Sequence, residues 1–248
     1  MSRFWAIIQE LLVEYDLFFF HSDTFDCDRT KGMIMKKIGV LGSGIVGEVL
    51  ANGFLKHGYS VMRGSRSPEK LGEWKTSHGE ANIGDFKETA AWADIIVLCV
   101  QGLHAVAALE LVGDDVLSGK TIIDATNPIS GEEPVNGVIS FFTGPNESLM
   151  EQLQSRFTQA HFVKAFSSVG NPQMVNPDYN GVLPTMFICG NSAEAKADVT
   201  DILTKFGWET GDMGQVEAAR AIEPLCILWC IPGFLNNSWN HAFKILKP

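Results

Sequence analysis

A glycine-rich turn between a strand and a helix constrains this chain more than any other feature of its sequence. The turn, Gly42-Ser43-Gly44-Ile45-Val46-Gly47, follows the apolar run 36–41 and opens the helical pattern 46–56. In such a corner the first glycine permits the tight turn, the second lets the backbone approach a pyrophosphate, and the third lets helix and strand pack closely. Backbone amides and the helix dipole then face the anion. An ordinary glycine-rich turn is the alternative, but the flanking strand and helix favour dinucleotide binding.

The residues after the second expected strand, 60–63, indicate which dinucleotide is bound. An NAD enzyme usually places a carboxylate there for the ribose hydroxyls, whereas this chain reads Gly64-Ser65-Arg66-Ser67. A carboxylate would repel the 2′-phosphate of NADP, while Ser65 and Arg66 can donate hydrogen bonds to it. Lys70 is either a further cation for this phosphate or a solvated surface lysine. Arg63 lies at the end of the strand, so a structural role is the favoured interpretation of this residue.

The remainder of the chain alternates short apolar runs with helical patterns, which is typical of a parallel sheet with crossover helices. We expect strands at 36–41, 60–63, 95–100, 121–124, 161–165, 185–189 and 208–210, and helices at 46–56, 105–111, 148–157 and 193–206. Gly58 and Gly207 are expected to end helices in left-handed conformations. The fold class is α/β, with a Rossmann-type, doubly wound, mostly parallel sheet and a small C-terminal helical appendage. From residue 216 the chain is mostly apolar and helical, with Pro224 and Pro232 starting or bending helices.

These patterns predict an N-terminal extension at 1–34, an NADP-binding domain at 35–214 and a helical segment at 215–248. Charged residues within 4–20 argue against a membrane-spanning helix, and the chain start lacks the pattern of a secretory signal. The extension is an amphipathic helix that docks on the protein or on a membrane, a partner-binding segment, or the product of an upstream start codon translated in error. We favour the last, which predicts that a chain starting at Met35 folds and binds nucleotide.

Composition narrows the class of protein. With 19 basic and 29 acidic residues the net charge is −10, which disfavours nucleic acid as a partner. A chain that is 46% hydrophobic and 19% charged is globular rather than disordered. The five cysteines (Cys27, Cys99, Cys189, Cys226 and Cys230) form no metal-like CxxC pair, so we expect reduced thiols in the cytoplasm and no metal site.

Several motifs resemble those of the coenzyme F-420-dependent NADP oxidoreductases and their relatives in the membrane-bound ferric reductases of animals. The resemblance runs from about Met35 to near the C-terminus. It rests on the strand and turn at 38–61 and on GSRSPEK (64–70), IDATNP (123–128), VKAFSSVGNPQM (163–174) and ARAIEPLCILW (219–229). The first motif is shared with many dinucleotide-binding proteins, while the others narrow the match.

The resemblance implies an enzyme that passes hydride between NADP and a deazaflavin, coenzyme F-420, or a flavin. The resemblance implies that the turn, Ser43 to Val46 with the glycines Gly42, Gly44 and Gly47, contacts the pyrophosphate. The remaining cofactor-binding residues that it implies are Ser65, Arg66 and Lys70 at the 2′-phosphate, Val100, Gln101 and His104 near the ribose and nicotinamide, and Ala125 and Asn127 beyond the next strand. Two departures, Gln101-Gly102-Leu103 in place of a common proline and Ser167 in place of an asparagine, bear on the identity of the acceptor.

Hydride transfer between planar rings needs positioning more than acid–base groups, so we assign no catalytic residue. Candidates to wall the acceptor are Phe166, Met174, Phe141 and Phe142, together with the loop 127–146, although each of these side chains is more often simply part of the core. We expect a cytoplasmic homodimer that associates through its C-terminal helices, acts on a small-molecule redox co-substrate, and inserts stably into no membrane. The alternatives are a carbonyl or imine reductase resembling pyrroline-carboxylate reductases, which needs a proton donor, and a non-catalytic NADP-binding redox sensor.

Overall fold

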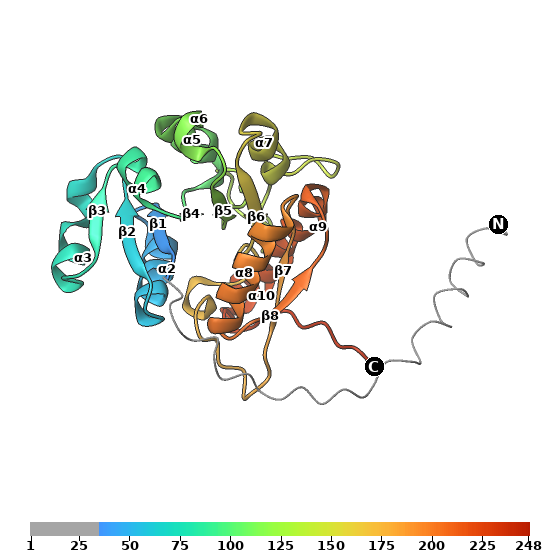
Figure 1. The fold of residues 1–248 in the computed structure, drawn as a ribbon. Helices are drawn as coiled ribbons and strands as arrows, with labels where there is room; N and C mark the ends of the chain where they lie inside the picture. The colour runs from blue at the N-terminus through green and yellow to red at the C-terminus, as the bar shows by residue number, and fades with distance from the viewer. Residues whose placement is uncertain (1–34) are drawn as a thin grey trace, which may run out of the picture. The chain divides into compact units, whose positions relative to one another are not determined.

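Six parallel strands form the central sheet of residues 35–248, the part of the chain that the computed structural model describes (Figure 1). Their order across the sheet is β3-β2-β1-β4-β5-β6. The strands are β1 (Lys37–Leu41), β2 (Ser60–Gly64), β3 (Asn82–Gly84), β4 (Ile95–Leu98), β5 (Thr121–Asp124) and β6 (His161–Lys164). The order reverses between β1 and β4, and ligands of such sheets bind at the carboxyl ends of the strands beside this reversal. The predictions for residues 1–34, Cys27 included, lie outside the described residues.

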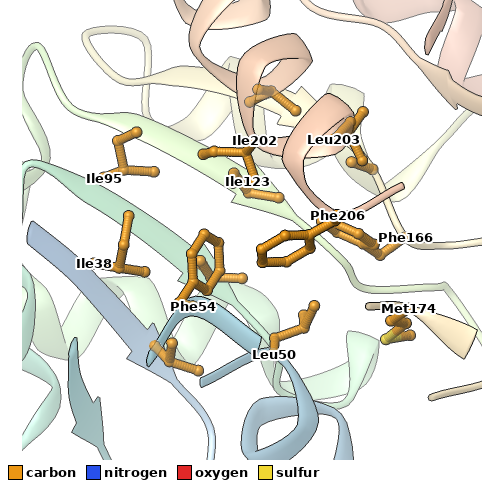
Figure 2. Packing of buried hydrophobic residues seen from close by; sticks show 14 of the residues in the cluster. Ile38, Leu50, Phe54, Ile95, Ile123, Phe166, Met174, Ile202, Leu203 and Phe206 are labelled. Carbon is orange, nitrogen blue, oxygen red and sulfur yellow. The ribbon is translucent and has the colours of Figure 1, made fainter. Parts of the chain in front are cut away.

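Helices cover both faces of this sheet, as its strands require. All four residues of β4 and of β5 are buried, so these strands are covered on both faces. On one face pack α2 (Ile45–Lys56) and α8 (Ala193–Lys205), and on the other pack α4 (Phe86–Trp92), α5 (Ala105–Val112) and α7 (Leu149–Arg156). Figure 2 shows the first cluster, in which Phe54 and Phe206 lie against the strands with ring centroids 4.9 Å apart. The doubly wound α/β fold is confirmed.

Two expected strands lie outside the main sheet. β7 (Thr185–Ile188) and β8 (Glu209–Asp212) pair in parallel as a separate two-stranded sheet. A single antiparallel bridge between Lys164 and Cys189 connects this small sheet to β6. Strand patterns alone could not separate the two sheets, because apolar runs of this length suit either one.

The sequence analysis missed four short elements: β3, α3 (Gly72–Ser77), α4 and α6 (Asp114–Leu117). β3 has three residues, too few for a recognisable alternation. The start of α4 carried a usable signal, because Asp85 and Glu88 form a capping box, each side chain accepting from the other's backbone N–H. Gly58 and Gly207 adopt the expected left-handed conformations, with φ of +82° and +85°.

The C-terminal helices are shorter than expected. α9 spans Ala219–Ile222 and α10 spans Pro224–Asn236, with Pro224 in the first turn as expected and Pro232 inside the helix. Asn237 follows α10 in a left-handed conformation, and the last twelve residues, 237–248, are not helical. Instead, the carbonyl of Phe243 accepts from the backbone N–H of Thr185 in β7. The prediction of a helical segment that reaches residue 248 is therefore wrong beyond Asn236.

Among residues 35–248, one helical run, Val216–Asn236, is long and apolar enough by length and composition to cross a membrane. Its mean hydropathy is 1.4, and a core helix of a soluble protein passes the same test. This run and the sheet belong to one unit, Met35–Pro248, and the boundary that we predict at residue 214 stays a prediction.

Candidate functional site

The three glycines of the turn after β1 each have a distinct steric environment. Gly42 has a φ of +148°, and a Cβ there would lie 2.7 Å from the carbonyl oxygen of Cys99. A Cβ on Gly47 would lie 2.6 Å from the carbonyl oxygen of Gly42. A Cβ on Gly44 would meet no atom within 4 Å, so this backbone faces open space. The turn is thus closed on its protein side and open where an anion would approach the amides.

A cavity of about 630 Å³ lies over this turn and the carboxyl ends of β2 and β4. It brings together nine residues that the sequence analysis predicted: Gly42, Ser43, Gly44, Ser65, Arg66, Lys70, Val100, Gln101 and His104. Its further lining was not predicted: Ser67, Phe86, Cys99, Ala107, Ala108 and Leu111. Ser67 lies in the motif GSRSPEK, while the other five are small or apolar and no motif in the sequence distinguishes them from core.

The corner of this cavity after β2 is suited to a phosphate. Ser65 is 4% exposed, and its Oγ accepts from the backbone N–H of Ser67 at 3.1 Å, so the hydroxyl proton is left to donate. Arg66 and Lys70 line the same cavity. Among the residues that the structure places on its walls there is no Asp or Glu. Two cations, a hydroxyl and no carboxylate fit the 2′-phosphate of NADP.

A second cavity, of about 320 Å³, adjoins the first along Cys99, Val100 and Gln101, which line both. It contains the five predicted residues Val46, Val100, Gln101, Ala125 and Asn127. Its further lining comes from Gly102, Leu103, Thr126, Ile129, Ser130 and Gly131. The loop after β5 thus contributes to the site as expected, through its first residues.

Close contact between two loops fixes the shape of the second cavity. The side-chain amide of Asn127 donates from Nδ2 to the carbonyl oxygen of Ser167 at 2.8 Å. A Cβ on Gly102 would lie 2.0 Å from the carbonyl oxygen of Asn127. The loops after β4 and β5 therefore meet backbone to backbone, which accounts for glycine at position 102.

Some predicted residues lie elsewhere. Ile45 is 60% exposed, and neither it nor Gly47 lines either cavity. Phe166 and Met174, predicted as possible walls of an acceptor site, are 1% and 4% exposed and belong to the hydrophobic core (Figure 2). Burial against α2 and α8 explains their position, so the core interpretation of both is correct.

The other two aromatic candidates, Phe141 and Phe142, are also absent from the lining of the second cavity. Phe141 instead borders a third cavity, of about 200 Å³, beside Arg220 and Glu223. Ile129 and Phe141 form an isolated antiparallel bridge, which folds the loop back on itself. The bridge thus joins a residue that lines the second cavity, Ile129, to one that borders the third, Phe141.

A buried ionic cluster behind the second cavity was not predicted. Lys164 is fully buried, and its Nζ lies 2.7 Å from Asp124 Oδ2 and 2.8 Å from Glu223 Oε1. It also donates to the carbonyl oxygen of Thr126 at 3.0 Å. Burial lowers the pKa of Lys164, but the two carboxylates more than offset this and hold the pKa above its usual value. The cluster therefore links β5, β6 and the start of α10.

Glu223 has a second set of partners, the N-terminus of α7. The backbone N–H groups of Leu149 and Met150 donate to its carboxylate at 3.0 and 3.1 Å. These two amides have no partner within their own helix. Each charged member of the cluster lies in a different one of the quoted motifs, IDATNP, VKAFSSVGNPQM and ARAIEPLCILW. Because these members are separated by 40 to 99 residues along the chain, the motifs did not indicate that they meet.

The cysteines of the described region are all free thiols: Cys99, Cys189, Cys226 and Cys230. Burial raises the pKa of Cys189 to about 12, and it also raises the pKa of Cys99. Within residues 35–248, no group of three or more His, Cys, Asp or Glu residues is arranged to hold a metal ion.

Comparisons with known proteins agree with this geometry. Residues 37–128 match the sequence profile of the family described as "NADP oxidoreductase coenzyme F420-dependent". A crystal structure described as a putative F420-dependent NADP-reductase from Arthrobacter sp. FB24 is 30% identical and has a TM-score of 0.80, over 86% of this chain and all of that chain. Metalloreductase STEAP3 of Rattus norvegicus is 29% identical over 86% of this chain and 43% of its own length.

This chain spans less than half the length of the curated metalloreductases that it matches. A reductive aminase from Aspergillus terreus, solved in complex with NADPH and ethyl-5-oxohexanoate, is 18% identical with a TM-score of 0.58, over 79% of this chain and 60% of that one. That likeness shows the fold alone. The 30% identity over the whole of the Arthrobacter protein, together with the phosphate turn and the order of the six strands, shows that this chain belongs to the coenzyme F420-dependent NADP oxidoreductase family.

Proposed function

We propose that this NADP-dependent oxidoreductase transfers hydride between NADP(H) in the larger cavity and a planar redox heterocycle in the second cavity. The heterocycle is the deazaflavin coenzyme F-420 or a flavin. One observation carries this proposal: the two cavities adjoin along Cys99, Val100 and Gln101 at the carboxyl edge of the sheet. Two rings bound on either side of that segment would be neighbours, as hydride transfer requires.

The residues of the larger cavity suit the parts of the dinucleotide. The amides of the turn at 42–44, with the N-terminus of α2, would hold the pyrophosphate. Ser65, Arg66 and Lys70 would hold the 2′-phosphate, and the apolar wall of Phe86, Ala108 and Leu111 would hold the adenine. Val100 and Gln101 line both cavities, His104 lines the larger one, and Ala125 and Asn127 line the second; these residues would hold the ribose and nicotinamide where the two cavities adjoin. Asn127 is oriented there by its bond to Ser167.

The lining of the second cavity supports hydride transfer to a ring over reduction of a carbonyl. None of the residues that the structure places around it is Lys, Tyr, His, Asp or Glu. The one titratable group of that lining is the Cys99 thiol, whose pKa burial raises above its usual value. A carbonyl or imine substrate needs a positioned acid. NADPH, when bound, supplies the hydride, while the mostly apolar walls exclude water.

A parallel assay tests the acceptor. We expect purified protein to oxidise NADPH with coenzyme F-420, FMN or FAD faster than with ferric chelates alone or with small carbonyl compounds. Ser130→Phe, which fills the second cavity, should abolish turnover while leaving the affinity for NADPH within about twofold. Ser155→Phe, at an exposed position of α7, is the matched control and should leave both turnover and the affinity for NADPH unchanged. A preference for a carbonyl or imine substrate would overturn the proposal.

Two other functions remain as alternatives with distinct outcomes. One alternative is an imine or carbonyl reductase, because this chain shares its fold with the reductive aminase of A. terreus. Fast turnover with imine or carbonyl substrates would favour that function. A redox sensor would bind NADPH tightly and oxidise it slowly with every acceptor. The metalloreductase relatives make ferric chelates a necessary arm of the assay, in the presence and absence of flavin.

We further propose that the protein is a cytoplasmic homodimer that binds neither nucleic acid nor the membrane interior. The four free thiols of the described region suit a reducing compartment. The net charge of −10 opposes binding to a phosphate backbone. Support for the dimer comes from the exposed apolar side chains of α10, which include Leu228 at 55% and Leu235 at 57% exposure.

A further inference from the structure

Arg63, in β2, is a charged residue buried beside the phosphate turn. Its side chain is 1% exposed, and it points toward α2 and α3. Its Nη2 lies 3.4 Å from the carbonyl oxygen of Gly44, and its Nη1 lies 3.5 Å from Glu48 Oε2. Its Cζ lies 4.9 Å from the centroid of the Trp74 ring. From the sequence alone, a position in a strand favoured a purely structural role.

These contacts satisfy the guanidinium of Arg63 incompletely. A guanidinium carries five N–H donors, and both of its oxygen contacts are longer than the usual 2.7–3.2 Å of a hydrogen bond. Its Nε is buried and has no hydrogen-bond partner in the part of the chain that the structure describes. Burial lowers the pKa of Arg63 and Glu48 raises it, and the group remains charged at neutral pH. A buried charge with so few partners is costly to fold.

A cavity connects this charge with the cofactor site. It has a volume of about 270 Å³ and is lined by Arg63, Glu48 and Trp74 and also by Ser43 and Lys70. Ser43 and Lys70 line the large cofactor cavity as well. The guanidinium therefore lies on the inner side of a wall whose outer side faces the corner that suits a 2′-phosphate.

We propose that Arg63 is a specificity-determining residue for the 2′-phosphate of NADP(H), acting through its charge from behind Ser43 and Lys70. The inference rests on the proposed position of the 2′-phosphate and adds a third, inner cation to Arg66 and Lys70. Because the charge is buried, solvent and salt screen it less than they screen the two surface cations. Its effect falls mainly on the doubly charged 2′-phosphate, so it raises the affinity for NADP over NAD.

Calorimetry with the full chain separates this role from a structural one. We expect Arg63→Met to weaken NADP⁺ binding by about tenfold, because removing a buried charge near the phosphate loses a Coulombic attraction of about this size at the effective dielectric constant near a protein surface. NAD⁺ binding should change by less than about twofold, and Arg63→Lys should restore most of the difference. A merely structural role for Arg63 would weaken both nucleotides alike, and that result would overturn the inference.

A substitution of Glu48 should change the ratio of NADP⁺ to NAD⁺ affinity in the opposite direction from Arg63→Met. It faces Arg63 from the first turn of α2, and its side chain is 46% exposed. Glu48→Gln should raise the ratio of NADP⁺ to NAD⁺ affinity by about two- to fivefold, the range of a partly exposed ion pair. This variant keeps the inference testable if circular dichroism shows that Arg63→Met is unfolded. An unchanged ratio in Glu48→Gln would count against the role of Arg63.

Arg66→Met is the control for the site itself. It should lower the affinity for NADP⁺ and leave that for NAD⁺ unchanged. If Arg66→Met leaves the ratio unchanged, the proposed position of the 2′-phosphate fails. If Arg66→Met lowers the ratio and Arg63→Met does not, only the inference about Arg63 fails.

Discussion

At the scale of single residues, Gly44 is a position where a substitution should weaken cofactor binding without destabilising the fold. Its φ of −77° and ψ of 178° are open to any residue, and an added Cβ meets no protein atom within 4 Å. Gly44→Ala should therefore change the free energy of unfolding by less than about 0.5 kcal/mol. The methyl group occupies the space where a pyrophosphate would approach, so the affinity for NADPH should fall by about tenfold or more, measured by fluorescence titration.

Gly72→Ala is the matched control for this experiment. A Cβ on Gly72 also meets no atom within 4 Å, but this residue starts α3 and lines none of the cavities described above. It should leave the affinity for NADPH unchanged. Equal affinities in the two variants would show that the turn does not bind the pyrophosphate.

The buried Lys164 gives the second prediction at this scale. Lys164→Met leaves Asp124 and Glu223 as buried charges without their cation, so the free energy of unfolding should fall by about 3–5 kcal/mol in urea titrations. Lys36→Met removes the partner of Asp198 in a surface pair and should cost no more than about 1 kcal/mol. Similar losses in both variants would contradict the importance that we assign to the buried cluster.

Arg63 and Lys164 show the limit of sequence analysis at this scale. Both are strand residues, and their partners lie on other elements: Glu48 on α2 for Arg63, and Asp124 and Glu223 for Lys164. Pattern and spacing identify groups that face a ligand from a motif, such as Ser65 and Arg66. They do not identify charges that meet only when the chain is folded.

At the scale of elements, α7 and α9 are joined by a bidentate ion pair whose effect depends on pH. Arg220 Nε lies 3.0 and 2.9 Å from the two carboxylate oxygens of Glu151. These hydrogen bonds, with a smaller contribution from Ser148, lower the pKa of Glu151. The stability from this shift is present above the unfolded-state pKa, about 4.3, and is lost as the pH falls through the lower folded-state pKa.

Arg220→Met should therefore lower the melting temperature at pH 7, with a difference from the wild type that shrinks as the pH falls below about 4. Thermal unfolding followed by circular dichroism between pH 2.5 and 7 measures this. Glu151→Gln is the control, because it lacks the titrating group. A difference between wild type and Arg220→Met that stays constant to the lowest pH would contradict the assignment.

The success of prediction for elements depended on their length and burial. The central strands β1, β4 and β5 were identified from their apolar runs, because a strand covered on both faces leaves no other pattern. β3 and α6 have three and four residues, too few to show a period. The long loop after β5 was recognised as part of the site, but no sequence signal indicated that only its first residues line the second cavity while Phe141 borders the third.

At the scale of the whole molecule, the exposed apolar surface of α10 predicts a dimer. Leu228 and Leu235 lie seven residues apart on α10, hence on one face, and Val135 in the neighbouring loop is 68% exposed. Gly137 of that loop approaches Leu235, so the loop and helix present a joint surface. Light scattering after size exclusion should give twice the chain mass of 27.2 kDa.

A double variant, Leu228→Glu with Leu235→Glu, should yield a monomer, because charged residues are unfavourable in the core of an interface. Its affinity for NADPH should stay within about twofold of the wild-type value, since α10 lines neither of the two adjoining cavities. A wild-type protein that is monomeric at micromolar concentration would contradict the dimer.

The close approach of Gly102 to Asn127 also restricts how this enzyme could be engineered. Because a Cβ at position 102 would lie only 2.0 Å from the Asn127 carbonyl oxygen, this position accepts no side chain unless both loops shift. A library aimed at new electron acceptors would keep that glycine and randomise Leu103, Ile129 and Ser130. These three side chains flank the contact on both loops, so they could be varied while the main-chain approach that shapes the second cavity is kept.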